Sequence, residues 1–411
     1  MTHLPWRRLL GFSALPLLAS FAPLLVLPVL VRAIGANGWA DVAIGLSVGA
    51  AGSILVNFGW GVLGPASVAP VAEIEANAIY RTSLIMRLAL CIPVLPLVFL
   101  AAVSLAGGPS PTAAGVMAIA AAIGGLSPAW FFIGRGKPGG VAIWDTIPRL
   151  VAALLSLPAL LLYPHAMSYA LVTLFVTASA WLAIGFVLSA RGPQLSWRLE
   201  RSVIRGAFRD QTSLAASSLA SGLYTSLGVA LVSVVDFSAV AAFAAADRVR
   251  GMGKQGEMAF ANGFQSWVAS SGLQDGSRRV RAFSAMVLMG AVGLVALVGF
   301  TLFLPLLAPI LFGPEITVGP LLAFFMGLSL FCTATSMSAT FHVLAPHGRA
   351  RVISIATIAG SVVGAPAIVG GTMYFGAIGA AAGLALAELV VMTIELPLAL
   401  GVLKKLSGGR P

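Results

Sequence analysis

Apolar stretches long enough to cross a membrane recur along the whole chain, and this repetition limits the possible folds more than any other feature. Gly11–Val31 and Met286–Phe303 are two examples. A transmembrane α-helix needs about 20 apolar residues, whereas the strands of a membrane barrel alternate apolar and polar residues over about ten positions. Only 9% of the 411 residues are charged and 59% are apolar, which leaves too few charges to cover a soluble fold. The sequence therefore predicts an all-α polytopic membrane protein.

Twelve spans fit this pattern and use roughly 260 residues, which leaves no room for a separate soluble domain. Arg7 and Arg8 precede an apolar run that is too long for a signal peptide, so we interpret this run as the first transmembrane helix. The expected spans are 9–31, 42–64, 82–106, 113–133, 141–163, 168–189, 212–235, 239–270, 282–305, 318–341, 350–374 and 377–401. Three small-residue motifs predict close contacts between helices, namely Gly45–Gly49, Gly360–Gly364 and Gly379–Gly383.

The basic residues predict how these spans are oriented. Lys and Arg concentrate in cytoplasmic loops, and most of the 24 in this chain fall near the termini or in every second connection. Examples are Arg81 and Arg87 in the second connection, and Lys404 and Lys405 near the C-terminus. Both termini are therefore expected in the cytoplasm. The net charge of +11 follows from this topology and does not indicate binding of nucleic acid.

The longest polar connection divides the chain at its middle. We expect an N-terminal lobe at 1–190 (helices 1–6), a cytoplasmic linker at 191–211 and a C-terminal lobe at 212–411 (helices 7–12). Both lobes start from the same side of the membrane, as in parallel repeats related by an axis along the membrane normal. Trp130–Arg135 weakly echoes Phe341–Ala345. Two six-helix lobes around a central cavity predict a substrate site between them, near the midplane.

The sequence contains no pattern typical of covalent catalysis, of a metal site or of a cofactor. Cys91 and Cys332 lie inside apolar spans and are interpreted as packing residues. Gly134–Gly139 matches G-x-G-x-x-G, but a dinucleotide site needs a strand before this motif, and here it links two membrane helices. The histidines are far apart and lack the spacing of metal ligands: His3, His165, His342 and His347.

The most informative feature is a set of charges inside the eighth span. Four have the spacing of one helical face and a fifth lies about a quarter turn away: Asp247, Arg250, Lys254 and Glu257, then Arg248. A charge at the bilayer centre costs roughly 2.5–3.5 kcal/mol, so these groups should not face lipid. One interpretation is structural pairing, as Asp247–Arg250 and Lys254–Glu257. The other is that this face lines a hydrated cavity and offers cations to an anionic substrate.

Four further charges are candidates for the same cavity. Arg149 on helix 5 either adds a cation there or extends towards the cytoplasm. Arg32, at the end of helix 1, runs against the orientation bias and fits either an external phosphate contact or an interfacial anchor near Asp41. Glu388 and Glu395 on helix 12 lie nearly on one face and fit either ion coupling or pairing with a neighbouring helix.

Several short motifs along nearly the full chain are shared with one family of transporters. They are Leu27–Gly38 (LPVLVRAIGANG), Asn57–Gly61 (NFGWG), Pro128–Gly134 (PAWFFIG), Phe312–Glu315 (FGPE) and Tyr374–Ala381 with Glu388. Together they resemble the polysaccharide-exporting Wzx-type flippases of the multidrug/oligosaccharidyl-lipid/polysaccharide superfamily. Asn57 departs from that family, which often has an acidic residue there. The chain also lacks the two extra helices of the related lipid II flippases.

The resemblance implies movement of an undecaprenyl-diphosphate-linked oligosaccharide across the bacterial inner membrane, and we expect alternating access between the two lobes. It implies that cations on helices 1 and 8 contact the diphosphate, here Arg32, Arg248, Arg250 and Lys254. The expected partners are membrane lipids and, by association, a glycan polymerase or glycosyltransferases.

Three other functions compete with this one. A cation-coupled multidrug exporter of the same fold would favour acidic residues in the N-terminal lobe, yet the predicted helices 1–4 contain no clear buried carboxylate. A membrane glycan polymerase or glycosyltransferase would need a sizeable external loop, and every predicted external link is short. A structural scaffold or inactive transporter would tolerate neutral substitutions on the charged face of helix 8.

Overall fold

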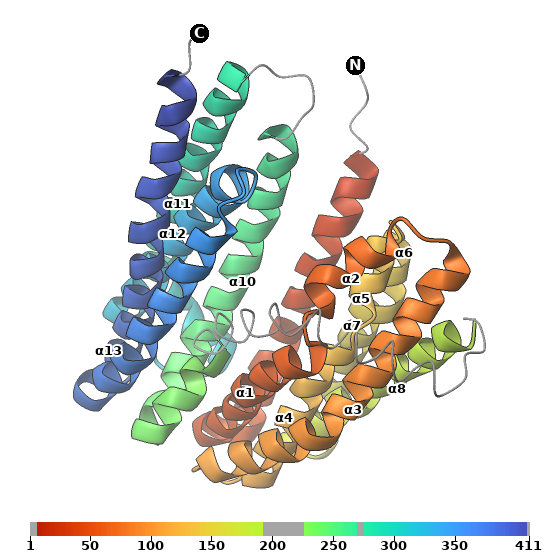
Figure 1. Cartoon of the computed structure of the whole chain (residues 1–411). Helices are drawn as coiled ribbons and strands as arrows, with labels where there is room; N and C mark the ends of the chain where they lie inside the picture. The colour runs from red at the N-terminus through yellow and green to blue at the C-terminus, as the bar shows by residue number, and fades with distance from the viewer. Residues whose placement is uncertain (1–5, 192–225, 269–274, 409–411) are drawn as a thin grey trace. The chain divides into compact units, whose positions relative to one another are not determined.

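The computed structural model describes residues 6–191, 226–268 and 275–408 (Figure 1). All regular structure within these ranges is helical, so the predicted all-α class is confirmed. The same ranges contain eight helical stretches that are long and apolar enough to cross a membrane. The chain divides into two compact units, Met1–Ser233 and Val234–Pro411, and each is described by itself. The predicted linker at 191–211 lies almost entirely outside the described residues.

Unit 1 consists of long helices interrupted by short irregular turns of helix. Its elements are α1 (Trp6–Asn57), α2 (Trp60–Val68), α3 (Glu73–Leu105), α4 (Pro111–Ala122), the 3₁₀ helix η1 (Ile123–Leu126), α5 (Ala129–Gly134), α6 (Pro138–Val141), the π-helix η2 (Ala142–Thr146), α7 (Ile147–Leu162) and α8 (Ala166–Ala190). The helix Ser226–Val235 is the described part of the predicted seventh span. Its Ser226 carbonyl accepts a 2.6 Å hydrogen bond from the Ser47 hydroxyl of α1.

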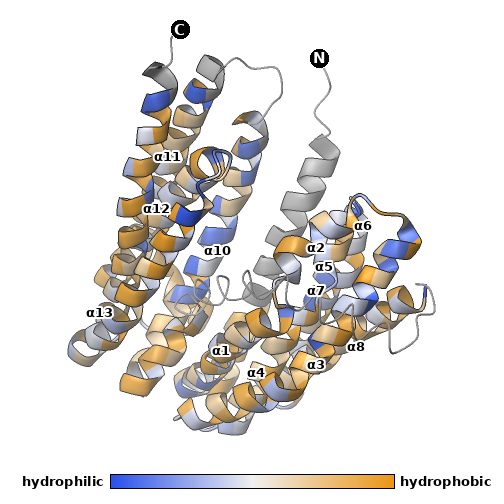
Figure 2. Cartoon of the chain, viewed as in Figure 1, coloured by the Kyte–Doolittle hydropathy of each residue, from blue (hydrophilic) through white to orange (hydrophobic). Residues whose placement is uncertain are grey.

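Unit 2 is simpler and contains four long helices and one π-helix. These are α10 (Phe237–Val268), α11 (Asp275–Phe312), α12 (Pro320–Ser338), the π-helix η3 (Ala339–Leu344) and α13 (Ala350–Gly408). Many large apolar side chains point outward, such as Phe375 of α13, which is 72% exposed. Figure 2 shows how widely hydrophobic residues cover the helices. Such surfaces suit a lipid environment, because exposed apolar patches of this extent are rare on soluble monomers.

Two of the helices each contain two predicted spans, joined at a glycine. In α1 the break is at Gly35 (φ 71°, ψ 176°), and in α13 it is at Gly376 (φ 56°, ψ −136°). Both glycines have a positive φ that other residues adopt only at a cost. The two parts of α13 fold back on each other, because Gly371 lies against Gly379. A side chain at either position would collide with the opposite backbone, so the predicted close contact at Gly379 is confirmed.

Two predicted spans are interrupted in unit 1. The span at 42–64 breaks at Phe58 (φ 46°) and Gly59 (φ 84°), which separate α1 from α2. The span at 113–133 tightens into η1 and then breaks at Ser127 before Pro128. Proline disfavours helical geometry in the residue before it, so the break at Ser127 has a local cause. Hydropathy alone does not reveal such interruptions, because the broken segments are as apolar as continuous ones.

The weak sequence echo between the two halves corresponds to a repeated turn. After α5, the Gly136 amide bonds to the Ile133 carbonyl at 3.0 Å and the Lys137 amide to the Phe132 carbonyl at 2.9 Å. After η3, the Gly348 amide bonds to the Ala345 carbonyl at 3.1 Å and the Arg349 amide to the Leu344 carbonyl at 2.9 Å. Both glycines have positive φ, 63° and 70°, as in Schellman helix ends. The same kind of turn therefore follows α5 in unit 1 and η3 in unit 2.

Candidate functional site

The charged face of α10 contains one ion pair that the sequence suggested. The Arg250 Nε donates a 2.8 Å hydrogen bond to Asp247 Oδ1, and Nη2 lies 2.8 Å from the same oxygen. The Arg250 side chain is only 5% exposed, against 26% for Asp247. The pair brings together residues three apart on one helix, which is a favourable spacing for opposite charges. Arg250 is therefore at least partly neutralised within its own helix.

The second suggested pair does not form. Within the described part of the chain, Lys254 makes no ion pair, and both carboxyl oxygens of Glu257 are buried without a hydrogen-bond partner. Arg248 also forms no ion pair among the described residues, and its Nε is buried without a partner. Arg248 and Lys254 are half-buried, whereas Glu257 is only 2% exposed. Figure 2 shows these hydrophilic positions on α10 within a largely hydrophobic unit.

Two carboxyl groups of α13 extend this polar region of unit 2. Glu388 and Glu395 are both buried, and Glu388 Oε1 has no partner among the described residues. The Thr340 hydroxyl donates a 2.9 Å hydrogen bond to Glu395 Oε2. Glu388 lies within electrostatic range of both Glu257 and Glu395. Like charges in a buried environment repel each other strongly, so these three groups cannot all be ionised without a compensating cation.

A buried histidine connects η3 to α10, and the sequence did not indicate its role. His342 Nε2 lies 3.1 Å from the Ala261 carbonyl, and Nδ1 lies 2.8 Å from the Ser338 hydroxyl. A carbonyl only accepts, so Nε2 carries the proton in that bond. His342 thereby fixes the π-helix beside the charged face of α10. Its hydrogen bonds are both satisfied, which indicates a positioning residue.

The two predicted substrate-binding cations of unit 1, Arg149 and Arg32, contact neighbouring residues. Arg149 Nη2 lies 3.2 Å from Asp145 Oδ1, and its guanidinium lies 5.2 Å from the centre of the Trp181 ring. Arg32 is exposed, and its Nη1 donates a 3.2 Å hydrogen bond to the Pro28 carbonyl. These two cations therefore belong to α7 and α1 of unit 1, whereas the charged face belongs to α10 of unit 2. Their proposed contacts with a substrate remain predictions.

Asp41 of α1 is fully buried, and this corrects the statement that the first helices contain no clear buried carboxylate. Its two carboxyl oxygens accept hydrogen bonds from the Gly108 amide at 2.9 Å and from the Ser110 amide at 2.8 Å. These amides precede α4 and have no partner inside that helix. The sequence argument overlooked Asp41 because it lies near the predicted membrane boundary. Because both of its oxygens are held by these amides, Asp41 does not by itself supply the acidic cavity residue that a multidrug exporter would favour.

Arg87 is another correction, because it lies inside α3 and not in a cytoplasmic connection. It is fully buried, and its Nη1 donates hydrogen bonds to the carbonyls of Gly125 (3.0 Å) and Ser127 (3.1 Å). The guanidinium also lies over the rings of Tyr80 and Trp130, at 5.6 and 5.8 Å. The carbonyls that it contacts are those left open by the break between η1 and α5. Arg87 therefore compensates a helix interruption inside the membrane.

Comparisons with known proteins show which fold the chain has, but they do not show its family. No family model matches the chain, and no curated protein matches its sequence. The fold is similar to an inward-facing multidrug resistance MATE family transporter of the MOP superfamily, with a TM-score of 0.63 and 16% identity over 97% of this chain and 96% of that one. It is also similar to the eukaryotic MATE transporter AtDTX14, with a TM-score of 0.60 and 13% identity over 97% of each chain.

A third neighbour is a transporter of the MOP superfamily from Pyrococcus furiosus, whose described binding pocket has reversed polarity. Its TM-score is 0.52 at 14% identity, over 97% of this chain and 94% of that one. These similarities cover nearly the whole chain and establish that it has the fold of multi-pass MOP-superfamily transporters. At such low identity they do not identify the substrate.

Proposed function

We propose that this protein exports a polyprenyl-diphosphate-linked oligosaccharide across the membrane by alternating access. The observation that supports this proposal most is the state of Arg248 and Lys254. Both are half-buried cations on the 32-residue helix α10, which is not among the eight stretches apolar enough to cross a membrane, and neither forms an ion pair among the described residues. A half-buried cation is costly unless it faces water or binds an anion. A diphosphate supplies the missing negative charge.

The chemistry of the substrate fits these two residues. The planar guanidinium of Arg248 matches two phosphate oxygens at once, and the ammonium of Lys254 adds a compact positive charge. A bare diphosphate cannot cross hydrocarbon, because its charge would lose water without compensation. In the proposed mechanism these cations hold the diphosphate while the glycan stays hydrated and the polyprenyl tail stays in lipid.

The remaining charges of unit 2 take other roles in this proposal. Arg250 is held by Asp247 and keeps the face of α10 in place, so it contributes less to substrate binding than its neighbours. Glu257, Glu388 and Glu395 are proposed to couple transport to an ion, because three of their carboxyl oxygens are buried without a hydrogen-bond partner among the described residues. Protonation or cation binding at these carboxyls would remove the repulsion between them.

A cation-coupled multidrug exporter is the second candidate. The buried carboxyl group of Glu257 favours it, since a cationic drug would pair with an acidic residue. The fold is equally compatible with this function. The two candidate functions differ in one testable respect. Binding of a cationic drug would depend on Glu257 and Glu388, not on Arg248 and Lys254.

The deciding experiment replaces Arg248 and Lys254 with Gln in one variant. Glycan export is measured in cells whose surface glycan depends on this protein, with membrane levels of the protein matched. We expect export to fall at least tenfold, since one charge-assisted contact contributes about 1.5–3 kcal/mol. The matched control, Lys137→Gln with Arg191→Gln, removes two exposed cations from unit 1 and should leave export unchanged.

The two candidate functions give opposite results in a parallel assay. If Arg248→Gln with Lys254→Gln leaves glycan export unchanged, the flippase proposal is wrong. If Glu257→Gln abolishes resistance to cationic drugs while glycan export never depended on the protein, the multidrug exporter is the correct assignment.

A further inference from the structure

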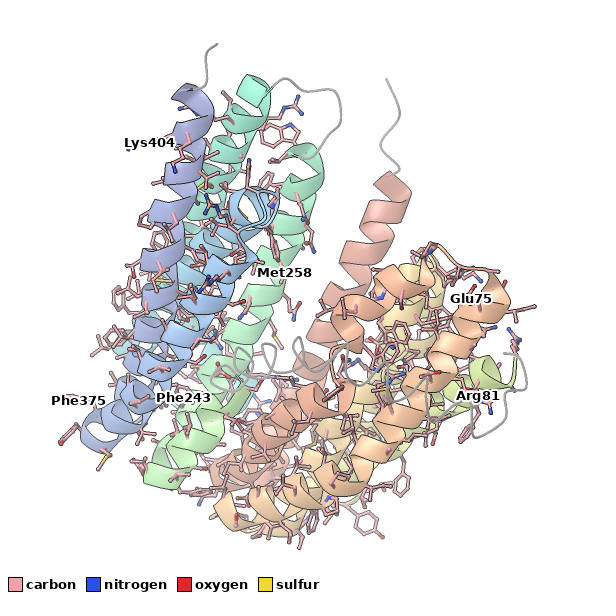
Figure 3. All side chains as sticks on the ribbon, viewed as in Figure 1. Glu75, Arg81, Phe243, Met258, Phe375 and Lys404 are labelled. Carbon is pink, nitrogen blue, oxygen red and sulfur yellow. The ribbon has the colours of Figure 1, made fainter. Side chains whose placement is uncertain are left out.

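Two grooves lie on either side of the last helical segment of α13, at one end of unit 2. The first has a volume of about 350 Å³ between α11 and α13. Its lining residues are Arg279, Val280, Phe283, Leu400, Leu403 and Lys404. Figure 3 labels Lys404 at this end of unit 2 and Phe375, next to the break at Gly376, at the opposite end of the unit. The floor of the groove is therefore apolar, and two cations stand at its rim.

The second groove repeats this composition on the other side of the same segment. It has a volume of about 260 Å³, and Arg349 and Lys405 are its two cations. Apolar residues from η3 and both parts of α13 form the rest, including Leu344, Val352 and Leu398. Gly401 also lines it, and a side chain added there would meet nothing within 4 Å. The space beside Gly401 is therefore open, and Gly401 lies in a helix without backbone strain.

The position of these grooves in the chain suggests what fills them. Both rims belong to one end of unit 2, where α11 begins. Because α13 folds back on itself, both of its ends lie there as well. The sequence predicts that this end is on the cytoplasmic side. Val280 and Phe283 are 64% and 51% exposed, as expected for side chains in contact with acyl chains. Lys and Arg at such positions extend their charged ends into the headgroup layer. Basic pockets between transmembrane helices on this side of a membrane bind anionic headgroups.

We propose that each groove binds one anionic phospholipid, with the phosphate at the basic rim and an acyl chain on the apolar floor. The pairs are Arg279 with Lys404 in the first groove and Arg349 with Lys405 in the second. Two features together support this assignment. Each groove has a pair of cations at its rim, and apolar surface lies directly beside each pair. A soluble anion would use the cations alone, and a zwitterionic lipid would gain less from them, because its ammonium group offsets the charge of its phosphate. This site is separate from the charged face of α10 and does not depend on the proposed transport function.

The test counts lipids on the purified, full-length protein by native mass spectrometry. The protein is delipidated and then titrated with phosphatidylglycerol or with phosphatidylethanolamine of the same acyl chains. We expect about two tightly bound phosphatidylglycerol molecules on the wild-type protein and none of the zwitterionic lipid at the same concentration. Each cation near an anionic surface contributes about fivefold in affinity, so removing a pair should weaken one site by about thirtyfold.

Two variants address the grooves separately. Arg279→Gln with Lys404→Gln should remove the first lipid, and Gly401→Phe should remove the second by filling its groove without changing any charge. The controls are Lys137→Gln with Arg191→Gln for the charge, and Gly299→Phe for the added bulk, since Gly299 also meets nothing within 4 Å. Both controls should keep two bound lipids.

Several outcomes would overturn the proposal. One is equal retention of phosphatidylglycerol and phosphatidylethanolamine, and another is full retention by both groove variants. Competition by glycerol phosphate at concentrations similar to those of the lipid would identify a site for free anions. Preferential binding of polyprenyl phosphate over phosphatidylglycerol would show that the grooves serve the lipid carrier and not the bulk membrane.

Discussion

The two units bury charges in opposite ways. In unit 1, Asp41 accepts hydrogen bonds from amides that precede α4, and Arg87 donates to carbonyls left open by the break between η1 and α5. In unit 2, among the described residues, both carboxyl oxygens of Glu257 are buried without a hydrogen-bond partner, and Arg248 and Lys254 form no ion pair. Because unsatisfied buried charges are costly, proteins keep them mainly where a ligand or ion completes them. The comparison indicates structural roles for the buried charges of unit 1, and it supports the proposal that those of unit 2 take part in transport.

The largest expected effect is on Arg87 of unit 1. Arg87→Leu removes the donor to the Gly125 and Ser127 carbonyls, and it leaves both groups open inside the membrane. We expect a loss of about 3–5 kcal/mol in stability, comparable to breaking a buried ion pair. Thermal unfolding in detergent, followed by size-exclusion chromatography, measures this loss. Lys137→Leu is the control for an exposed cation, and an equally stable Arg87→Leu protein would remove the structural role of Arg87.

A smaller effect is expected for Asp41. Asp41→Asn keeps the shape of the side chain but loses the charge, and only one of its two terminal atoms still accepts hydrogen bonds. The free energy of unfolding should fall by about 1.5–3 kcal/mol, since hydrogen bonds to charged groups contribute about that much. The same thermal assay measures it. If the stability does not change while drug resistance disappears, Asp41 has a transport function and the contrast between the units fails.

The repeated turn predicts equal effects in the two units. Gly136→Ala and Gly348→Ala each place a side chain at a positive φ and should each cost about 1–2 kcal/mol. Neither glycine has a neighbour that an added Cβ would meet, so backbone strain alone sets the cost. Parallel thermal unfolding of both variants checks this. A clear difference between them would show that the two turns are not structurally equivalent.

The smallest effect on stability is expected for Glu257 of unit 2. Glu257→Gln removes a buried charge that has no hydrogen bond to lose, so stability should change by less than about 1 kcal/mol or increase. Transport should nevertheless fall, if this carboxyl couples transport to an ion. Thermal unfolding and export assays on the same preparation separate the two properties. A marked loss of stability would mean that Glu257 has a structural partner after all.

The sequence predicted the class of fold well, because hydropathy reports directly on membrane spans. The weak echo between the halves stays a prediction, although both segments end in the same kind of turn, at Gly136 and at Gly348. It missed the breaks at Phe58–Gly59 and Ser127, since broken and continuous helices are equally apolar. For the same reason Arg87 was counted as a loop residue: only the structure reveals that its charge is balanced by the carbonyls of a distant helix end.

The charged face of α10 was visible in the sequence, but the partners of its members were not. Helical spacing suggested Asp247–Arg250 and Lys254–Glu257 equally, and only the first pair forms. Glu257 lies within electrostatic range both of Lys254 on its own helix and of Glu388 on α13. His342 was excluded as a metal ligand by its spacing, yet spacing along the chain could not reveal its bonds to Ala261 and Ser338.

Direct binding of the lipid-linked substrate tests the central claim more sharply than any assay in cells. Purified protein is titrated with a fluorescent polyprenyl diphosphate, and the affinity of the wild type is compared with that of the variant carrying Gln at 248 and 254. We expect at least a tenfold weaker affinity for the variant, and an unchanged affinity for Lys137→Gln with Arg191→Gln. Equal affinities for the wild type and the α10 variant would contradict the assignment of these two cations to the diphosphate.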